Sequence, residues 1–230
     1  MGHDETKTQS LQSPKMAALE RLDCCNCYVM DEYCYFYKRN SKIILKTMPA
    51  TDPFNMYYLA VLCPSDIEDK VLKHKLWMRD HFGCTVALKS PAHITLIPPF
   101  WLRREAEQSL VDTVQSFQTD LMPVEIQLEG FSHFNDRVLF IAVNENQQLS
   151  VLCKETEKHF IQHFKGIIKP DDRPFHPHIT IANRDIKPGD FISAWQHFSN
   201  EKFEESFQTN AISLLKLNSG QWEVIAEKTC

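Results

Sequence analysis

The sequence predicts an α+β fold built as a pseudo-two-fold duplication. From Met56 onward, strand-like and helix-like segments alternate in the order strand, helix, strand, helix, strand, and the same order then repeats. Two segments of one pattern, residues 93–96 (HITL) and residues 178–181 (HITI), lie 85 residues apart, one in each half. A repeated order that carries a repeated motif predicts two similar lobes that pack together.

The first elements follow from apolar runs and helix signals. Met56–Cys63 is an apolar run with the length of a buried strand. Ser65–Glu68 (SDIE) has the pattern of a capping box, which opens a helix that ends at Gly83. The pattern then predicts, in order, a strand-like segment at Thr85–Leu88, a strand at His93–Ile97 and an amphipathic helix at Arg103–Gln118.

The later elements follow from the same signals. They are two strands at Val124–Phe134 and Val138–Val143 joined at Asn135–Arg137, a helix at Gln147–Phe164, a strand at His178–Ala182, a helix at Pro188–Phe198 entered through its proline, and a closing hairpin of Phe207–Leu217 and Trp222–Glu227 around Ser219-Gly220.

Residues 1–55 differ in character from residues 56–230. The first 55 residues hold seven basic and seven acidic side chains, whereas the remainder carries the whole net charge of −5. No periodicity is sustained in the leader, which ends in a linker with Pro49 and Pro53. We expect a functional domain at 56–230 and an appendage at 1–55 that is poorly ordered or reflects a misassigned start site.

Charge and composition restrict the class of protein. A net charge of −5 without a basic stripe argues against a protein that coats duplex nucleic acid. No run approaches the roughly 18 apolar residues of a membrane span, and the polar N-terminus has no signal-peptide core. The eight cysteines are scattered or lie in the leader, as reduced thiols would. We therefore expect a cytoplasmic monomer that makes no membrane contact.

The paired H-x-T motifs carry the chemistry. Because side chains at i and i+2 of a strand share a face, His93 and Thr95 point one way, and His178 and Thr180 do the same in the other half. Two imidazoles suit paired proton donation and acceptance, and threonine hydroxyls can bind phosphoryl oxygens. This arrangement requires no metal or other cofactor. A single such histidine would more simply be a packed, hydrogen-bonded side chain, but the duplication favours function.

The stretches 90–100 (SPAHITLIPPF) and 173–185 (RPFHPHITIANRD) resemble the two-histidine phosphoesterase superfamily, in its 2′-5′ RNA ligase and RNA 2′,3′-cyclic phosphodiesterase branch. The resemblance extends from Met56 to Cys230. It implies a bilobal α+β fold with two antiparallel sheets flanking a central cleft and helices on the outside. It also implies hydrolysis, without metal, of a 2′,3′-cyclic phosphate or a 2′-5′ linkage on an RNA terminus or a small nucleotide.

The resemblance also assigns roles to the motif residues. His93 would be the general acid, His178 the general base, and Thr95 and Thr180 would bind the phosphate. Many members place an arginine five residues after the second histidine, where this chain has Asn183 followed by Arg184.

Residues near the motifs are further candidates for substrate binding. Arg173 and Arg184 could clamp a phosphate, although surface solubility explains such arginines equally well. Phe100, Trp101 and Phe175 could stack on a base, with core packing as the alternative.

Other patterns point to rival functions. His176 with His178, His159 with His163, or Cys24, Cys27 and Cys34 could bind a metal, and Gly2 fits a myristoylation pattern. Each of these patterns is short and incomplete, so no metal site is predicted. The alternative function class is a nucleotide- or RNA-binding module that uses the same cleft without turnover.

Overall fold

The computed structural model describes residues 27–30, 33–36 and 53–230, and the chain forms two compact units, Met1–Pro49 and Ala50–Cys230. In the first unit, β1 (Cys27–Met30) pairs antiparallel with β2 (Tyr33–Phe36). The candidate cysteine site and the myristoylation pattern lie outside the residues whose side chains are described. No helix of the described residues is long and apolar enough to cross a membrane.

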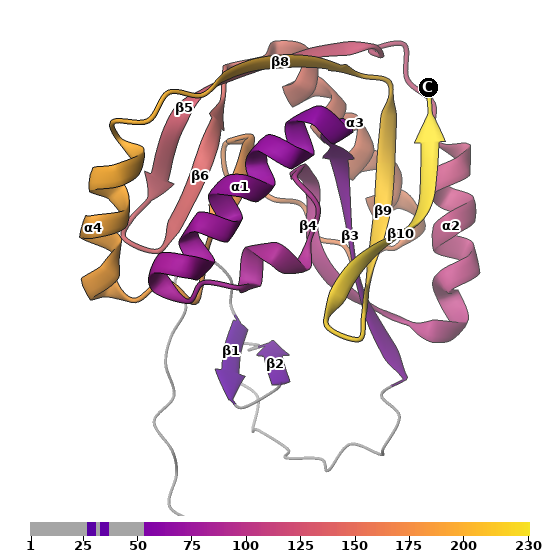
Figure 1. The fold of residues 1–230 in the computed structure, drawn as a ribbon. Coiled ribbons are helices and arrows are strands. Elements are labelled where there is room, and N and C mark those ends of the chain that lie inside the picture. Colours follow the sequence, from indigo (N-terminus) through magenta and orange to yellow (C-terminus); the bar gives the residue numbers. More distant parts are fainter. Residues whose placement is uncertain (1–26, 31–32, 37–52) are drawn as a thin grey trace, which may run out of the picture. The chain divides into compact units, whose positions relative to one another are not determined.

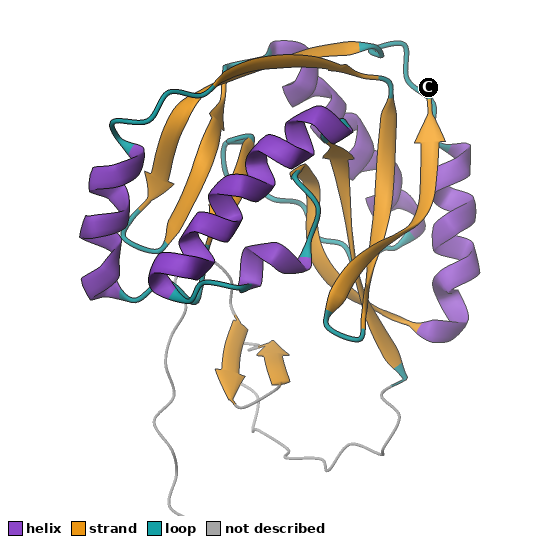
Figure 2. Cartoon of the chain, viewed as in Figure 1, coloured by secondary structure: helices purple, strands orange, loops and turns teal. Residues whose placement is uncertain are grey.

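The second unit is built on two four-stranded antiparallel sheets, coloured orange in Figure 2. The first sheet has the order β10-β9-β3-β4, with β3 at Phe54–Leu62, β4 at His93–Arg103, β9 at Ala211–Asn218 and β10 at Gln221–Thr229. The second has the order β7-β6-β5-β8, with β5 at Val124–Phe134, β6 at Val138–Val143, β7 at His178–Ala182 and β8 at Glu204–Thr209. The predicted α+β fold with two antiparallel sheets is confirmed.

Four α-helices pack on these sheets: α1 (Ser65–Phe82), α2 (Glu107–Ser116), α3 (Gln147–His163) and α4 (Pro188–Phe198). In Figure 1, α4 lies beside β5 and β6, and α2 lies beside β10. Each of the other two helices contacts a strand of the sheet that it does not follow in the chain. Helix α1 follows β3 of the first sheet but contacts β7 of the second, whereas α3 follows β6 of the second sheet and contacts both β4 of the first sheet and β5 of the second. One cluster of buried apolar side chains runs through both sheets and all four helices.

The two lobes are not consecutive halves of the chain. After β8 in the second sheet, the chain returns to the first sheet as β9 and β10. The predicted strand at Phe207–Leu217 is therefore wrong in its extent, because Asn210 separates β8, which pairs with β5, from β9, which pairs with β3. The hairpin turn is correct: Ser219 and Gly220 have φ values of 49° and 81°, in the left-handed region that such turns require.

The segment predicted as a strand at Thr85–Leu88 is a 3₁₀ helix, η1 (Val86–Lys89). A carboxylate oxygen of Asp185 accepts the backbone N–H groups of Thr85 (2.6 Å) and Val86 (2.8 Å), and this satisfies the first donors of the helical turn. An apolar run this short fits either conformation, and a residue 100 positions away decides between them.

Strand β4 continues beyond the predicted Ile97 to Arg103. Pro98 and Pro99 are exposed and lie where the register with β3 shifts, and β4 is an edge strand. Proline is tolerated at such bulges because no ladder hydrogen bond is lost. The helix predicted from Arg103 accordingly begins later, as a short 3₁₀ turn, η2 (Arg104–Ala106), followed by α2.

The predicted capping box is absent. The N-cap of α1 is Pro64, so Ser65 is already inside the helix and makes no capping bond. The carboxylate of Glu68 instead accepts the backbone N–H of Ala92, directly before β4.

Candidate active site

The two H-x-T motifs lie on two edge strands that contact each other, β4 of the first sheet and β7 of the second. Ile94 and Leu96 of β4, and Ile179 and Ile181 of β7, are all buried in the shared core. The strand period then turns the histidine and threonine of each motif to the opposite face, where all four are half-buried.

Both histidines make the same hydrogen bond. Nδ1 of His93 lies 2.7 Å from the carbonyl oxygen of Pro91, and Nδ1 of His178 lies 2.7 Å from that of His176. A carbonyl only accepts, so each Nδ1 carries the proton and each neutral ring has a lone pair on Nε2. In the part of the chain that the structure describes, neither Nε2 atom has a hydrogen-bond partner, so both are available for proton transfer.

The hydroxyls of Thr95 and Thr180 likewise form no hydrogen bond with any described residue, although both residues are half-buried. A threonine on a strand commonly bonds a neighbouring group when one is in reach. These two hydroxyls, each two residues from a histidine whose Nε2 has no partner among the described residues, can donate to an anionic ligand.

The environment of His93 favours its neutral form. Burial of the ring lowers its pKa to about 4, with the charges of Lys75 and His178 adding to the effect and the Pro91 hydrogen bond opposing it. The Tyr58 ring lies against the imidazole at a centroid distance of 4.8 Å. The contribution of His178 to the pKa of His93 agrees with the contact between β4 and β7.

The environment of His178 acts in the same direction. Burial lowers its pKa, the bond to the His176 carbonyl opposes this, and the charge of His176 adds to the lowering. Its ring contacts Phe134 and Phe140, each at a centroid distance of 5.0 Å. Both imidazoles are therefore neutral near pH 7 in the free protein.

Three residues around His93 were not predicted from the sequence. Tyr58 on β3 is buried, its hydroxyl is hydrogen-bonded to the Ser90 hydroxyl, and Trp222 of β10 meets its ring edge-on at 4.5 Å. With neighbouring Ala60 and Leu215, these rings form an apolar patch separate from the main core. The sequence does not identify Tyr58, because Met56–Cys63 is apolar throughout and its pattern does not show which side chains face the motif.

The candidate arginines lie on exposed segments. The guanidinium of Arg173 binds Asp171 in bidentate fashion, at 2.8 and 2.6 Å. Arg184 is exposed and has a φ of 46°, at the bend that leads into Asp185. In this structure Arg173 is thus engaged with a carboxylate of its own loop.

The candidate aromatic residues divide between core and surface. Phe100 is 6% exposed and packs against Tyr57, with ring centroids 6.1 Å apart, and Phe175 packs against the shared core. Trp101 is half-buried and belongs to neither apolar cluster. Core packing, the alternative to stacking on a base, accounts for the positions of Phe100 and Phe175.

The rival histidine pairs serve other contacts. Nε2 of His159 lies 3.1 Å from the carbonyl oxygen of Thr113 and therefore donates to it, which joins α3 to α2. Nδ1 of His163 donates to the carbonyl of His159 at 2.9 Å. Among the described residues, no group of three or more histidine, cysteine, aspartate or glutamate side chains is placed to hold a metal ion.

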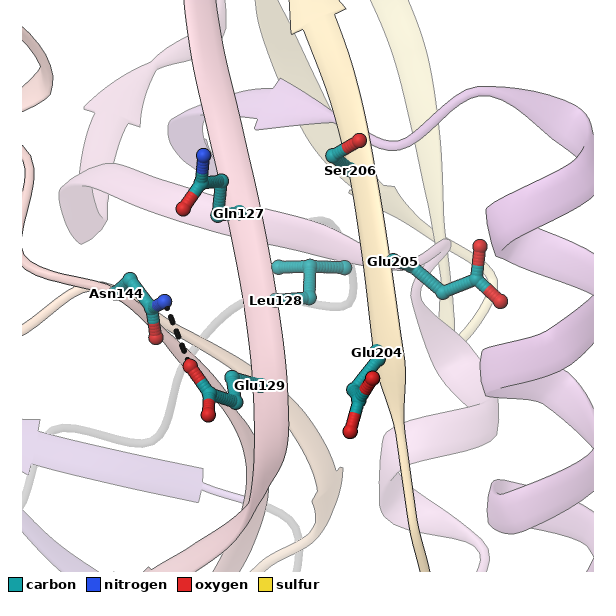
Figure 3. Close-up of a pocket in the computed structure, with 7 residues that line it drawn as sticks. All are labelled: Gln127, Leu128, Glu129, Asn144, Glu204, Glu205 and Ser206. Atoms are coloured by element: carbon teal, nitrogen blue, oxygen red, sulfur yellow. Dashed lines mark hydrogen bonds between the residues drawn. The ribbon is translucent and has the colours of Figure 1, made fainter.

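An open groove of about 590 Å³ lies on the second sheet and does not include the motif residues. Figure 3 shows that Gln127 and Glu129 of β5 flank it together with Asn144, which donates to Glu129 at 2.9 Å. The rest of its lining is Leu128, Glu204, Glu205 and Ser206. The lining comes from β5, from β8 and from the residue that follows β6, so the groove lies on the part of this sheet away from β7, which carries the second motif.

Two antiparallel sheets with one H-x-T motif on each of two adjoining edge strands agree with the two-histidine phosphoesterase superfamily. Residues 67–221 match the model of the 2′-5′ RNA ligase superfamily, and the chain belongs to this family. A Bacillus pumilus protein named "Putative phosphoesterase" is 24% identical over 140 residues, which cover 58% of this chain and 76% of that protein.

Solved structures show the same fold. Escherichia coli LigT complexed with 3′-AMP aligns with a TM-score of 0.55 and 17% identity, over 76% of this chain and 97% of LigT. A protein of Thermus thermophilus, TT0787, aligns with a TM-score of 0.54 and 18% identity, over 76% of this chain and 97% of that protein. Family membership supports a phosphoesterase or RNA ligase-like activity.

Proposed function

We propose that this protein is a metal-independent phosphodiesterase that hydrolyses a 2′,3′-cyclic phosphate, or a 2′-5′ linkage, on a small nucleotide or an RNA terminus. One observation carries the proposal: two histidines on adjoining edge strands hold their Nδ1 protons in identical 2.7 Å bonds and leave both Nε2 atoms without a partner among the described residues. Binding alone does not require two imidazoles prepared in this way.

The reaction would divide between the two rings. His178 takes a proton from water through Nε2 as the water oxygen bonds to phosphorus, and His93 delivers a proton from Nε2 to the departing ribose oxygen. The hydroxyls of Thr95 and Thr180 donate to the non-bridging phosphoryl oxygens, whose charge grows in the transition state. The product is a phosphomonoester.

The low pKa of His93 sets a condition on this assignment. In the free protein His93, with a pKa of about 4, holds a proton poorly near pH 7. A bound phosphodiester places a negative charge beside the rings and raises the pKa of both His93 and His178. The role of acid for His93, which the family resemblance suggests, therefore depends on bound substrate.

The groove on the second sheet and the aromatic residues near His93 favour a short substrate. The groove on the second sheet carries Glu129 and Glu204, whereas its Glu205 is paired with Lys70 at 2.5 Å, and a polyanionic strand laid along the groove would meet the first two carboxylates. On the first sheet, the half-buried Trp222 packs on the buried Tyr58, whose ring lies against His93, so this side of the site is apolar. A mononucleotide or a terminal nucleotide satisfies both constraints better than a long internal RNA segment.

The test is hydrolysis of a 2′,3′-cyclic mononucleotide in excess EDTA, with the His93→Ala variant as the control. We expect turnover by the wild type in EDTA and its loss in the variant. Turnover that EDTA abolishes and zinc or manganese restores would overturn the two-histidine mechanism.

A second candidate is a nucleotide-binding module without turnover. It is favoured by the lowered pKa of both histidines, which leaves the free protein without a proton donor near pH 7. Saturable binding of a cyclic mononucleotide, with no product at any pH between about 4 and 8, would select this candidate.

We further infer that residues 1–55, apart from Phe54 and Asn55 at the start of β3, are an appendage to this domain. Strand β3 begins at Phe54, the Pro53 carbonyl accepts the N–H of Arg104, and Asn55 donates to Tyr57, so a deletion that keeps these residues is the sharper test. A chain without residues 2–49 should fold and keep its activity, and loss of either would refute the inference.

A further inference from the structure

Lys75 of α1 is 2% exposed, the only buried lysine among the described residues. Its ammonium donates to the carbonyl oxygen of Ser90 at 2.8 Å. Burial lowers the pKa of Lys75, while the negative charge of Glu68, two helical turns earlier, opposes this. A buried ammonium is costly unless it is paired, so its position calls for an explanation beyond packing.

The Ser90 carbonyl belongs to a short segment, residues 90–92, that is held by hydrogen bonds throughout. The Ser90 hydroxyl is bonded to Tyr58, and the Ala92 N–H donates to Glu68. The Ala92 carbonyl accepts the N–H of Cys63 at 3.0 Å. Two of these partners, Lys75 and Glu68, come from one face of α1, seven residues apart.

Pro91, the middle residue of this segment, holds the imidazole of His93 by a hydrogen bond. The Pro91 carbonyl accepts from Nδ1 of His93 at 2.7 Å, and the Ser90 hydroxyl lies 3.4 Å from the same atom, so the positions of Ser90 and Pro91 set the ring orientation and favour the Nδ1–H tautomer. Pro91 has no N–H and a restricted φ. Because its backbone has little freedom, the positions of Ser90 and Ala92 determine the direction of the carbonyl between them.

The second motif has no equivalent support. His178 bonds to the His176 carbonyl, but no other described element forms a hydrogen bond with residues 174–177. His176 itself is exposed. The hydrogen bonds from α1 to residues 90–92 therefore distinguish His93 from His178.

We propose that Lys75 and Glu68 are positioning residues, which clamp the 90–92 segment from α1 and so fix the ring and tautomer of His93. The proposal rests on the proposed function for its kinetic consequence but not for its structural one. Lys75 touches no reacting atom and acts through Ser90 and Pro91.

The test compares three substitutions on α1 in the full chain. Lys75→Met removes the donor and the charge, Lys75→Gln keeps an amide donor but removes the charge, and Lys73→Gln is the matched control at an exposed position. The ¹⁵N chemical shifts of His93, followed by NMR through a pH titration, report its tautomer and pKa without substrate.

We expect Lys75→Met to give a mixed tautomer at His93 and to lower kcat/KM by about 10- to 100-fold, the scale of a small misplacement of a catalytic group. Lys75→Gln should retain more of the Nδ1–H tautomer. Both variants should raise the pKa of His93, because the nearby ammonium is gone while Glu68, Tyr58, Cys63 and His178 still face this region. Lys73→Gln should change none of these.

An unchanged tautomer and titration of His93 in a folded Lys75→Met protein would overturn the clamp. If Lys75→Met does not fold, an unchanged titration in Lys75→Gln overturns it equally. A wild-type protein without phosphodiesterase activity would refute the proposed function, and the NMR result would still decide the clamp.

Discussion

Acid should destabilise this protein through His93 in particular. The unfolded chain binds a proton at this ring with a pKa of about 6.5, whereas the folded protein does so only at about 4. Between these values the unfolded state holds more protons, so the free energy of unfolding falls as the pH falls. The stabilising effect of the neutral ring is fully present above about pH 6.5 and is lost toward pH 4.

The size of the effect follows from the same two values. With the folded and unfolded pKa about 2.5 pH units apart, His93 alone removes about 3 kcal/mol of unfolding free energy between pH 7 and pH 4. That is a large part of the stability of an ordinary domain. Other groups also titrate in this range, so a variant is needed to isolate the contribution.

The variant is His93→Asn, whose side-chain amide can still donate to the Pro91 carbonyl but cannot take up a proton. Urea unfolding, measured near pH 7 and near pH 4, gives the loss for each protein. We expect the wild type to lose about 3 kcal/mol more than the variant over this interval. Equal losses would show that His93 titrates normally, and would refute the argument that burial lowers the pKa of His93 in the free protein.

Three further predictions concern catalysis. The alkaline limb of kcat/KM should lie at lower pH than that of kcat, because bound phosphodiester raises the pKa of both histidines, and coincident limbs in the two pH profiles would contradict this. Single His93→Ala and His178→Ala variants should each lower the rate by about 10²–10⁴-fold, with the double variant little slower, whereas multiplicative losses in steady-state assays would mean that the rings act independently. Thr95→Val and Thr180→Val should each weaken transition-state binding by about 1.5–3 kcal/mol without changing the urea midpoint, and unchanged kinetics in both would remove the hydroxyls from the site.

Much of the fold was predictable where the local signals agreed. The bounds of β5, β6, β7 and α4 match their predicted ranges because turn residues or a proline mark their ends. Predictions were wrong where a distant residue decides. Asp185 accepts the first backbone N–H groups of the helical turn that was expected to be a strand at Thr85–Leu88. The Glu68 carboxylate binds the Ala92 N–H and does not cap its own helix. Strand β9 belongs to the first sheet because it pairs with β3.

The site was predictable to a similar degree. The strand period placed His93 and His178 away from the core, and the structure agrees. The sequence could not identify Tyr58 or Lys75 as neighbours of His93, because each is separated from the motif by a helix or a strand and neither forms part of a recognisable pattern.

Because α1 and α3 each contact a strand of the sheet that they do not follow, the chain cannot be cut into two independent lobes. A cut in the loop before Val124 would leave one fragment with β3, β4, α1 and α2, and the other with all of the second sheet, α3, β9 and β10. Each fragment would then expose the apolar face of a helix whose partner strand is in the other fragment. Neither fragment should fold alone. Because His93 and His178 would be on different fragments, the site should form only when the two fragments associate. This loop is therefore suited to a split protein whose activity reports the association of its fragments.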